Sequence, residues 1–569
     1  MDKRIVPIAP AGASKQRKRE APRGRVVAPQ ALTEVEALIG PPPRRHDLLI
    51  EYLHQINDRY GQLSAPHLAA LARLLGLAET EIYEVATFYH HFDVVKESGD
   101  GKVAAPPALT VRVCDGLSCE MAGARQLLER LPALLGREVR VIPAPCVGRC
   151  EQAPVAVVHQ KPVPSATLEA VQSAVIAGRT RDEPGSYIGL DAYRAQGGYN
   201  VLLDCIEHRR DLEGVLKTME NSGLRGLGGA GFPTGRKWRI VRAEPAPRLM
   251  AVNIDEGEPG TFKDRWYLER DPHRFLEGML IAAWAVDISA IYIYLRDEYH
   301  GCRALLEAEL AALAADPPMS PLPKIDLRRG AGAYICGEES AMIESIEGKR
   351  GMPRLRPPYV AQVGLFGRPT LEHNFETLHW VRELLEKGAD WFASQGRNGR
   401  KGLRSFSVSG RVKQPGVKLA PAGITIRQLI DEFCGGMLDG HNFYGYLPGG
   451  ASGGILPASM GDIPLDFDTL QPYGCFIGSA AVIVLSDQDT AKAAARNMMR
   501  FFEHESCGQC TPCRVGTAKT NMIIAKDAWD LPVLADLSQV MRDASICGLG
   551  QAAPNPVDCV VKYFPNEIS

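Results

Sequence analysis

Apolar residues recur at helical spacing near the start of the chain. Between residues 47 and 92, leucine, isoleucine and tyrosine return every three or four positions, as in DLLIEYLHQI, which is the period of a helix with one buried face. We therefore expect a small helical bundle over residues 41–100. Residues 1–40 lack this periodicity and are rich in Pro, Ala, Lys and Arg, so they predict a mobile basic extension, with a basic docking arm as the alternative.

The next segments alternate strand and helix patterns. The strand patterns LTVRV and REVRVIPAP flank the helical pattern AGARQLLERLPALL, which predicts a small α/β domain over residues 101–180. A stretch rich in Gly and Tyr predicts a linker over residues 181–204 that wraps the next domain. Over residues 205–400, the strand patterns RLMAVN, AIYIYL and KIDLRR alternate with long helical patterns, as in a larger, Rossmann-like α/β domain with ligand loops at its strand ends.

Two further modules follow. Short strand patterns with turn signals surround the helical TIRQLIDEF and predict a β-grasp-like module over residues 401–487. Residues 488–569 show a wholly helical pattern and predict a C-terminal helical bundle. The chain is thus expected to be an α/β multidomain protein.

Composition matters mainly for what it excludes. With 45% apolar and 23% charged residues, the chain matches folded globular protein. The 65 Lys and Arg residues balance 67 Asp and Glu residues, which leaves no general field to attract nucleic acid or anionic lipid. No apolar run is long enough to span a bilayer, and the N-terminus lacks the pattern of a secretory signal. We expect a cytoplasmic protein with neither nucleic acid nor a membrane as a partner.

Four cysteines near the C-terminus give the strongest chemical signal. Cys507, Cys510 and Cys513 are spaced by two residues, and Cys547 follows much later. Three closely spaced thiolates can hold one face of a cubane while a distant fourth closes it, which predicts a 4Fe-4S cluster. A structural zinc site is the alternative, although zinc sites favour two separated pairs.

A second cysteine group lies in the small α/β domain. Cys114 and Cys119 follow one predicted strand, and Cys146 and Cys150 follow another. Two pairs on adjacent loops can present four sulfurs to a flat 2Fe-2S cluster, with zinc as the alternative and disulfides disfavoured in a reducing compartment. The remaining cysteines lie among apolar residues and are expected to be buried free thiols: Cys205, Cys302, Cys336, Cys434, Cys475 and Cys559.

A glycine-rich segment, GLRGLGGAGFPTGRKW, contains the pattern G-x-G-x-x-G at Gly226, Gly228 and Gly231. A helical pattern precedes it, whereas the Rossmann fingerprint requires a strand. A backbone with so few Cβ atoms still lets amides approach a flat ring or a phosphate. Lys237 is a candidate positive charge beside a reduced flavin.

Polar residues gather where predicted strands end. Carboxylates there can accept hydrogen bonds from ribose, carboxamide or ring N–H groups, although a solvated acidic turn is the alternative. An Asn and a Thr stand at the start of a predicted helix, which suits either a phosphate or an ordinary helix cap. The candidates are Asp255, Glu256, Glu258, Glu338, Glu339, Asn374 and Thr377.

Four of these segments together resemble a known family. In the order GLRGLGGAGFPTGRKW, NIDEGEPGTFKD, GAGAYICGEES and ESCGQCTPCRVG, they closely resemble the NADH-binding flavoprotein subunit of respiratory complex I. The N-terminal cysteine pairs look like the thioredoxin-like 2Fe-2S subunit of the same enzymes. The regions that resemble these two subunits are fused in this chain, and together they cover nearly all of it after about residue 40.

Fusion in this order is similar to the beta subunit of soluble, metal-dependent, NAD-linked formate dehydrogenases. The similarity extends through DLLIEYLHQI, YEVATFYHHFDVVKE, LRRGAGAYICGEES and MRDASICGLGQAA. The diaphorase subunit of an NAD-reducing hydrogenase is the alternative, as is a fused NADH dehydrogenase flavoprotein subunit.

The resemblance also implies ligand contacts. The sequence departs from the family at His373, Arg356 and Tyr359, where Asn, Lys and Phe are common. The residues implied for FMN are Gly226, Gly228, Lys237, Asn253, Asp255, Glu256, Tyr334, Gly337, Glu338, Asn374 and Thr377. The residues implied for the nicotinamide nucleotide are Gly229, Phe232, Glu258, Glu339 and Tyr359.

The implied partner is a formate dehydrogenase alpha subunit with molybdenum or tungsten and iron-sulfur centres, together with further small subunits. Formate would be oxidised there, and FMN on this chain would reduce NAD+ by hydride transfer, so that no side chain need act as nucleophile or general base. The 4Fe-4S cluster would exchange electrons with FMN, and the 2Fe-2S cluster would be a branch or a store. A redox sensor without turnover is the alternative from another class; Phe232, Glu258 and Glu339 argue against it.

Overall fold

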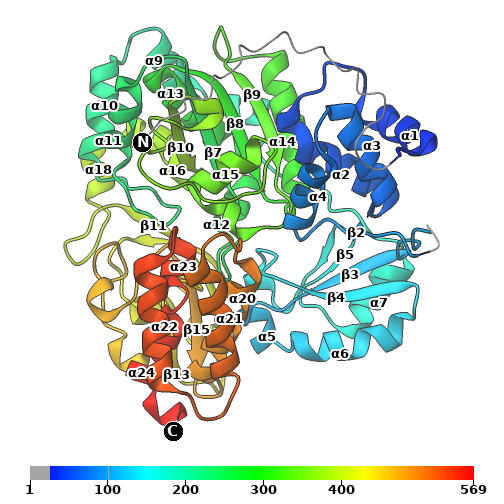
Figure 1. Ribbon diagram of the computed structural model, residues 1–569. Coiled ribbons are helices and arrows are strands. Elements are labelled where there is room, and N and C mark those ends of the chain that lie inside the picture. The colour runs from blue at the N-terminus through cyan, green and yellow to red at the C-terminus, as the bar shows by residue number, and fades with distance from the viewer. Residues whose placement is uncertain (1–25, 100–101, 569) are drawn as a thin grey trace, which may run out of the picture.

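A four-stranded parallel sheet forms the centre of the fold. This computed structural model describes residues 26–99 and 102–568. In Figure 1 the sheet domain occupies the upper part, with the N-terminal helical unit beside it and the small α/β unit and the C-terminal part below. The two central strands are largely apolar because helices and loops cover both faces of the sheet. The order of the four strands is β10 (Thr370–Asn374), β7 (Arg248–Ile254), β8 (Ile288–Leu295) and β9 (Lys324–Arg329).

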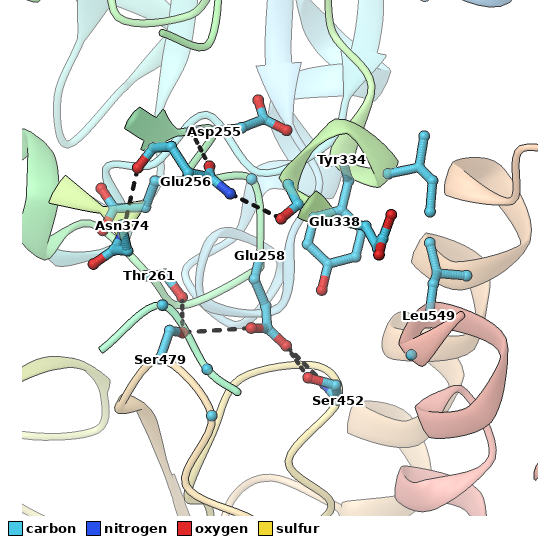
Figure 2. Close-up of a pocket in the computed structure, with 18 of the residues that line it drawn as sticks. Asp255, Glu256, Glu258, Thr261, Tyr334, Glu338, Asn374, Ser452, Ser479 and Leu549 are labelled. Carbon is cyan, nitrogen blue, oxygen red and sulfur yellow. Dashed lines mark hydrogen bonds between the residues drawn. The ribbon is translucent and has the colours of Figure 1, made fainter. Parts of the chain in front are cut away.

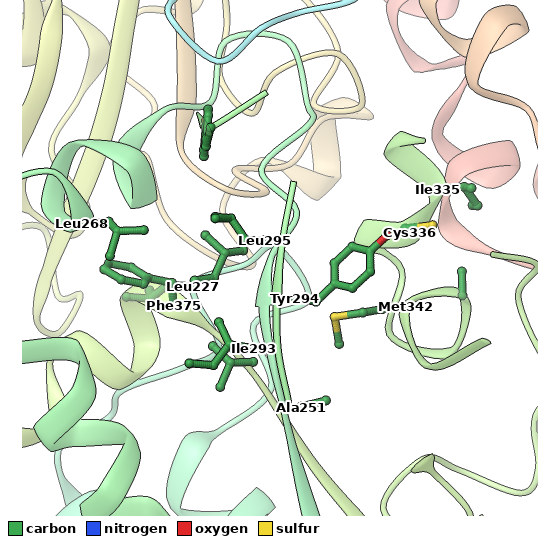
Figure 3. Packing of buried hydrophobic residues seen from close by; sticks show 14 of the residues in the cluster. Leu227, Ala251, Leu268, Ile293, Tyr294, Leu295, Ile335, Cys336, Met342 and Phe375 are labelled. Atoms are coloured by element: carbon green, nitrogen blue, oxygen red, sulfur yellow. The ribbon is translucent and has the colours of Figure 1, made fainter. Parts of the chain in front are cut away.

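Alternate side chains of β8 enter the core on opposite faces of the sheet. In Figure 3, Leu295 points to the side of Phe375, whereas Tyr294 points to the side of Met342. The helix α13, between β7 and β8, buries nearly all of its residues between the sheet and its neighbours. The helices of this domain are α10 (Leu212–Asn221), α11 (Thr234–Ala243), α12 (Lys263–Leu268), α13 (Pro272–Val286), α14 (His300–Ala315), α15 (Glu339–Ile346), α16 (Phe375–His379), α17 (Val381–Lys387) and α18 (Ala389–Ala393).

The N-terminal unit is helical, as expected, but begins earlier. Its first helix falls inside the segment expected to be mobile, and Val35 of that helix is completely buried. The prediction of a mobile extension is therefore wrong for residues 29–39, because their apolar face packs on the next helices; residues 1–25 lie outside the described residues. The helices are α1 (Pro29–Ile39), α2 (Leu49–Tyr60), α3 (Ala65–Leu75) and α4 (Glu79–Phe88).

The small α/β unit has its own hydrophobic core. Its sheet pairs one central strand in parallel with one neighbour and antiparallel with the other. The strands run in the order β4 (Val139–Ala144), β3 (Leu109–Cys114), β5 (Ala156–Val158) and β6 (Lys161–Val163). The helices are α5 (Leu117–Met121), α6 (Ala124–Leu135) and α7 (Leu168–Ile176).

The segment expected to be a linker contains α8 (Leu190–Ala195) and the start of α9 (Asn200–Ile206). Tyr193 and Tyr199 are buried against α13, where the Tyr193 hydroxyl donates to Glu277 at 2.6 Å. The segment thus follows the surface of the larger domain and adds to its core.

The C-terminal part combines a five-stranded sheet with helices. In sheet order, the strands are β12 (Gly416–Pro421), β11 (Leu403–Gly410), β15 (Ala481–Ser486), β13 (Phe443–Leu447) and β14 (Leu456–Pro457). The second strand, β11, is antiparallel to β12 and parallel to β15. The helices are α20 (Ala491–Glu505), α21 (Thr511–Ile524), α22 (Leu531–Ala544), α23 (Gly548–Ala552) and α24 (Asn555–Tyr563).

Within the described part of the chain, every helix is too short or too polar to cross a lipid bilayer.

The packing of α13 on α16 depends on Gly278. A Cβ at this position would lie 2.0 Å from the carbonyl oxygen of Leu378, so we expect Gly278→Ala to lower the free energy of unfolding by about 1–3 kcal/mol, the usual cost of overpacking. Gly185→Ala is the matched control, because a Cβ there meets no atom within 4 Å. Thermal melts followed by circular dichroism test this; equal melting temperatures for the two variants would contradict the packing.

Candidate functional site

A cavity of about 280 Å³ lies beyond the carboxyl ends of β7 and β10. This is where open α/β sheets bind ligands. Figure 2 shows that loops from the parallel-sheet domain, the β-grasp-like module and α23 surround it. The sequence-predicted residues that line it are Gly228, Gly229, Asn253, Asp255, Glu256, Glu258, Tyr334, Gly337, Glu338 and Asn374.

Three of the predicted residues are not among those that line the cavity: Gly226, Lys237 and Thr377. The Leu227 amide donates to the Thr377 hydroxyl at 2.9 Å, and the Gly226 amide donates to the Phe232 carbonyl at 2.8 Å, so Gly226 and Thr377 support the glycine loop. The Lys237 ammonium donates to the Glu372 carbonyl at 2.9 Å. Lys237 is not among the residues that line the cavity, and its role beside a flavin stays a prediction.

Three residues predicted for the nicotinamide nucleotide lie outside the cavity. Phe232 and Tyr359 are 38% and 56% exposed, so both rings are accessible for stacking. Glu339 is paired with Arg356 at 3.0 Å. Their roles in nucleotide binding remain predictions.

The glycine loop fits against the start of α16 without room for side chains. A Cβ on Gly228 would lie 2.9 Å from the Cβ of Asn374. Gly229 has a φ of +131°, a conformation that only glycine adopts without strain. The loop thus presents bare backbone to the cavity, as a flat ring lying close to it requires. Asn374 caps α16, since its Oδ1 accepts from the Glu376 amide at 3.1 Å, which agrees with the helix-cap interpretation.

Asp255 is a buried carboxyl with an unused acceptor. Its Oδ2 has no hydrogen-bond partner among the described residues, and burial raises the pKa of Asp255 well above its usual range. A buried polar atom without a partner is costly. A ligand that offers a ring N–H or hydroxyl group to this atom would remove that cost, and FMN carries both kinds of group.

A buried charged network forms the floor of the cavity. The Lys263 ammonium lies 2.7 Å from Asp264 and 3.1 Å from Glu376. Burial acts to lower the pKa of Lys263, but the two carboxylates raise it overall, so this lysine stays charged and its charge is balanced by Asp264 and Glu376. Glu256 accepts from the Asp264 amide at 2.9 Å, and burial, followed by the charge of Asp264, raises the pKa of Glu256 to about 7.

Glu258 is held by the β-grasp-like module. The Ser452 amide donates to its Oε1 at 3.0 Å, the Ser452 hydroxyl donates to the same atom, and the Ser479 hydroxyl donates to its Oε2 at 3.4 Å; Figure 2 shows Glu258 between these serines. Burial raises the pKa of Glu258. This carboxyl therefore has a defined orientation at the module boundary.

The sequence interpretation missed the residues that other units contribute. Lys263 and Asp264 stand inside a quoted motif, but only burial distinguishes them from an exposed ion pair. Gly257, Thr261 and Ile335 and the three lining residues of α23 also stand inside quoted motifs. The remainder are serine, glycine and phenylalanine residues of the β-grasp-like module, with no local signal: Ser452, Phe476, Gly478 and Ser479. The additional lining residues are Gly257, Thr261, Lys263, Asp264, Ile335, Ser452, Phe476, Gly478, Ser479, Gly548, Leu549 and Ala552.

The C-terminal cysteines converge, as the sequence predicts. Cys507, Cys510, Cys513 and Cys547 line one small cavity, and all four are free thiols. Four sulfurs around one space match the donor set of a 4Fe-4S cluster. Two further residues in its wall, Ile335 and Leu549, also line the larger cavity.

The N-terminal cysteines are also gathered and buried. Cys114 and Cys119 belong to β3 and α5, and the sulfurs of Cys146 and Cys150 on the loop after β4 are 3.3 Å apart. This donor set fits a 2Fe-2S cluster. Phe262, which is completely buried, packs against Cys146 and Cys150.

Two arginines of the larger domain fix the loop that carries Cys146 and Cys150. Arg296 donates to the Cys146 carbonyl at 2.7 Å, and Arg265 donates to the Gly148 carbonyl at 2.9 Å. Phe262 lies in sequence between Thr261 and Lys263, which both line the larger cavity. The segment 261–263 therefore contributes both to the cavity and, through Phe262, to the packing of Cys146 and Cys150.

Replacing Asp255 should weaken flavin binding. Asp255→Ala removes the unpaired acceptor, and loss of a hydrogen bond of this kind costs about 1.5–3 kcal/mol, so we expect the Kd for FMN to rise by roughly 10- to 150-fold. Fluorescence titration of the deflavinated protein measures this Kd. Asp439→Ala, at a side chain that is 92% exposed, is the control and should bind FMN like the unaltered protein. Unchanged FMN affinity of Asp255→Ala would refute the assignment.

Comparison with family models agrees with these units. The Nuo51 FMN-binding domain matches residues 219–383, and the NADH-ubiquinone oxidoreductase-F iron-sulfur binding region matches residues 493–569. The thioredoxin-like 2Fe-2S ferredoxin matches residues 35–178, and the SLBB domain matches residues 405–456. The expected fold class and the cofactor set of FMN, 4Fe-4S cluster and 2Fe-2S cluster, with NAD as substrate, are confirmed.

Individual proteins that are similar to this chain belong to the same kinds of enzyme as the matching family models. The chain is 41% identical to the mitochondrial NADH dehydrogenase (ubiquinone) flavoprotein 1 of Dictyostelium discoideum, over 66% of this chain and 81% of the relative. It is 39% identical to the mitochondrial NADH-ubiquinone oxidoreductase 51 kDa subunit of Neurospora crassa, over 62% of this chain and 76% of the relative. A crystal structure of an air-oxidised NAD+-reducing NiFe-hydrogenase matches with a TM-score of 0.80 and 32% identity, over 92% of this chain and 94% of that chain. The protein therefore belongs to the NADH dehydrogenase flavoprotein family of the complex I type, and it carries a thioredoxin-like 2Fe-2S domain on the N-terminal side of its FMN-binding domain.

Proposed function

We propose that this chain is the diaphorase subunit of an NAD-linked formate dehydrogenase. It would receive electrons from formate oxidation on an alpha subunit with molybdenum or tungsten, and return them to NAD+ as NADH. Bound FMN supplies the exchange between single electrons and hydride transfer. The choice of formate rests on the sequence resemblance, from DLLIEYLHQI to MRDASICGLGQAA.

One observation carries the electron-transfer part of the proposal. Ile335 and Leu549 line both the flavin cavity and the space between the C-terminal cysteines. The two sites therefore share part of their walls, and the shared side chains are aliphatic. Leu549 stands on α23 and faces the side of the cavity that carries Tyr334 (Figure 2).

The side chains around the cavity position and polarise ligands without forming bonds to substrate. Gly228 and Gly229 offer a flat backbone surface, and Asp255 offers an acceptor. Lys263, paired with Asp264 and Glu376, holds two strand-end loops in fixed positions. Such groups are already oriented before the ligand arrives, so binding need not reorganise them.

The same arrangement suits the diaphorase subunit of an NAD-reducing hydrogenase. The similarity to the hydrogenase structure extends over 92% of this chain, and this observation makes hydrogen the second candidate electron source. A cytoplasmic location is part of the proposal, because fourteen cysteines without a disulfide suit a reducing compartment.

The two electron sources can be compared directly. The natively purified complex is supplied with NAD+ and either formate or hydrogen, and NADH formation is followed by its absorbance. We expect formate to support NADH formation and hydrogen to give only the background rate. Reduction driven by hydrogen alone would replace the formate proposal with the hydrogenase one.

The cluster assignment has its own test. Cys510→Ser removes one of the four converging thiols, so we expect formate-dependent NAD+ reduction to fall to background while FMN remains bound and NADH oxidation by ferricyanide continues. Cys434→Ser, at a buried thiol outside both cysteine groups, should retain all three properties. Undiminished formate-dependent turnover in Cys510→Ser would exclude this cluster as the electron entry point.

A further inference from the structure

Two cysteines outside the cluster sites lie in contact with each other. The sulfurs of Cys475 and Cys559 are 3.5 Å apart, and the residues are only 1% and 3% exposed. Cys475 belongs to the β-grasp-like module, shortly before β15, whereas Cys559 belongs to α24. Their contact therefore joins the β-grasp-like module to the helical domain.

A glycine loop lies directly on these two sulfurs. A Cβ on Gly454 would be 2.6 Å from the sulfur of Cys475 and 3.0 Å from that of Cys559, and its φ is +80°. Two residues earlier, Ser452 donates from its amide and hydroxyl to Glu258. The thiol pair thus supports the loop that orients a carboxyl of the flavin cavity.

Helix α24 is attached to the same loop. Asn555, one turn before Cys559, donates to the Ser452 carbonyl at 3.0 Å. At the other end of the helix, the Tyr563 hydroxyl donates to the Tyr473 carbonyl at 2.9 Å. A movement of Cys559 relative to Cys475 would therefore change the position of Ser452.

We propose that Cys475 and Cys559 form a reversible disulfide when the cell is exposed to a peroxide. The sulfurs need to approach by about 1.5 Å to reach the S–S bond length of about 2.0 Å. The neighbouring thiol of Cys475 lowers the pKa of Cys559, and Lys562 and Arg542 add to this effect, which favours the Cys559 thiolate as the nucleophile.

The chemistry balances with a peroxide as the oxidant. The Cys559 thiolate attacks one peroxide oxygen, the O–O bond breaks, and the sulfur becomes a sulfenic acid while one water leaves after protonation. The Cys475 thiol then attacks that sulfur, the S–S bond forms, and the hydroxyl group leaves as a second water. Two thiols lose two electrons and two protons in total, and hydrogen peroxide becomes two waters. A dithiol restores the two thiols by thiol–disulfide exchange and is itself oxidised to a disulfide.

The effect on activity rests on the proposed function of the cavity. Closing the sulfurs beneath Gly454 moves Ser452 relative to Glu258, which weakens at least one hydrogen bond to that carboxyl. We expect the KM for NADH with ferricyanide as acceptor to rise by about two- to tenfold, the effect of one lost hydrogen bond.

Mass spectrometry of the holoprotein tests the disulfide without reference to activity. The protein is treated anaerobically with diamide, an azo compound whose N=N bond takes up the two electrons and two protons, and is then denatured in acid, alkylated and digested without reductant. We expect one cross-linked peptide pair that contains Cys475 and Cys559 and disappears after dithiothreitol. Complete alkylation of both cysteines after diamide treatment would overturn the proposal.

Variants separate the disulfide from its consequence. Cys559→Ser should lose both the cross-linked peptide and the diamide-induced rise in KM, whereas Cys434→Ser, a buried thiol in another part of the module, should retain both. A cross-link that forms without any change in KM would refute the coupling to Glu258. An absence of NADH oxidation before diamide treatment would refute the proposed function and leave the peptide result unaffected.

Discussion

The buried contact of Lys263 with Asp264 and Glu376 is the constraint on which the site depends. It ties the start of α12, after β7, to α16, after β10, at the carboxyl edge of the parallel sheet. Three charged groups without water are stable only while they remain paired, because each would be strongly destabilising alone. Their pairing fixes the two strand-end loops relative to each other, and the glycine loop and Asp255 take their positions from that frame.

The β-grasp-like module and the C-terminal helical domain supply the remaining walls of the cavity. The β-grasp-like module orients Glu258 through Ser452, and α23 adds Leu549, which faces the cavity on one side and the C-terminal cysteines on the other. Phe262 packs against Cys146 and Cys150, and its two chain neighbours line the cavity. The C-terminal cysteines therefore adjoin the cavity through apolar side chains, and the N-terminal cysteines contact a segment that also contributes to it.

Much of the fold was predictable because its signals are local. The strands KIDLRR and AIYIYL and the helices of residues 41–100 follow directly from apolar periodicity. The helix Pro29–Ile39 was missed, because its weak pattern gains stability from tertiary packing, which buries Val35. The Lys237 ammonium donates to the Glu372 carbonyl, a contact between distant segments that no local pattern encodes.

The sequence by itself determined the donor sets and the strand-end chemistry: two groups of four cysteines, a glycine loop, and carboxylates after strands. These depend on residue type and spacing, which are local properties of the chain. Only the tertiary structure decided which carboxyl has a free acceptor, which lysine carries a fixed buried charge, and that Ile335 and Leu549 separate two sites. Burial and contacts between segments hundreds of residues apart arise from packing, and packing sets the desolvation that distinguishes Asp255 and Lys263 from similar residues at the surface.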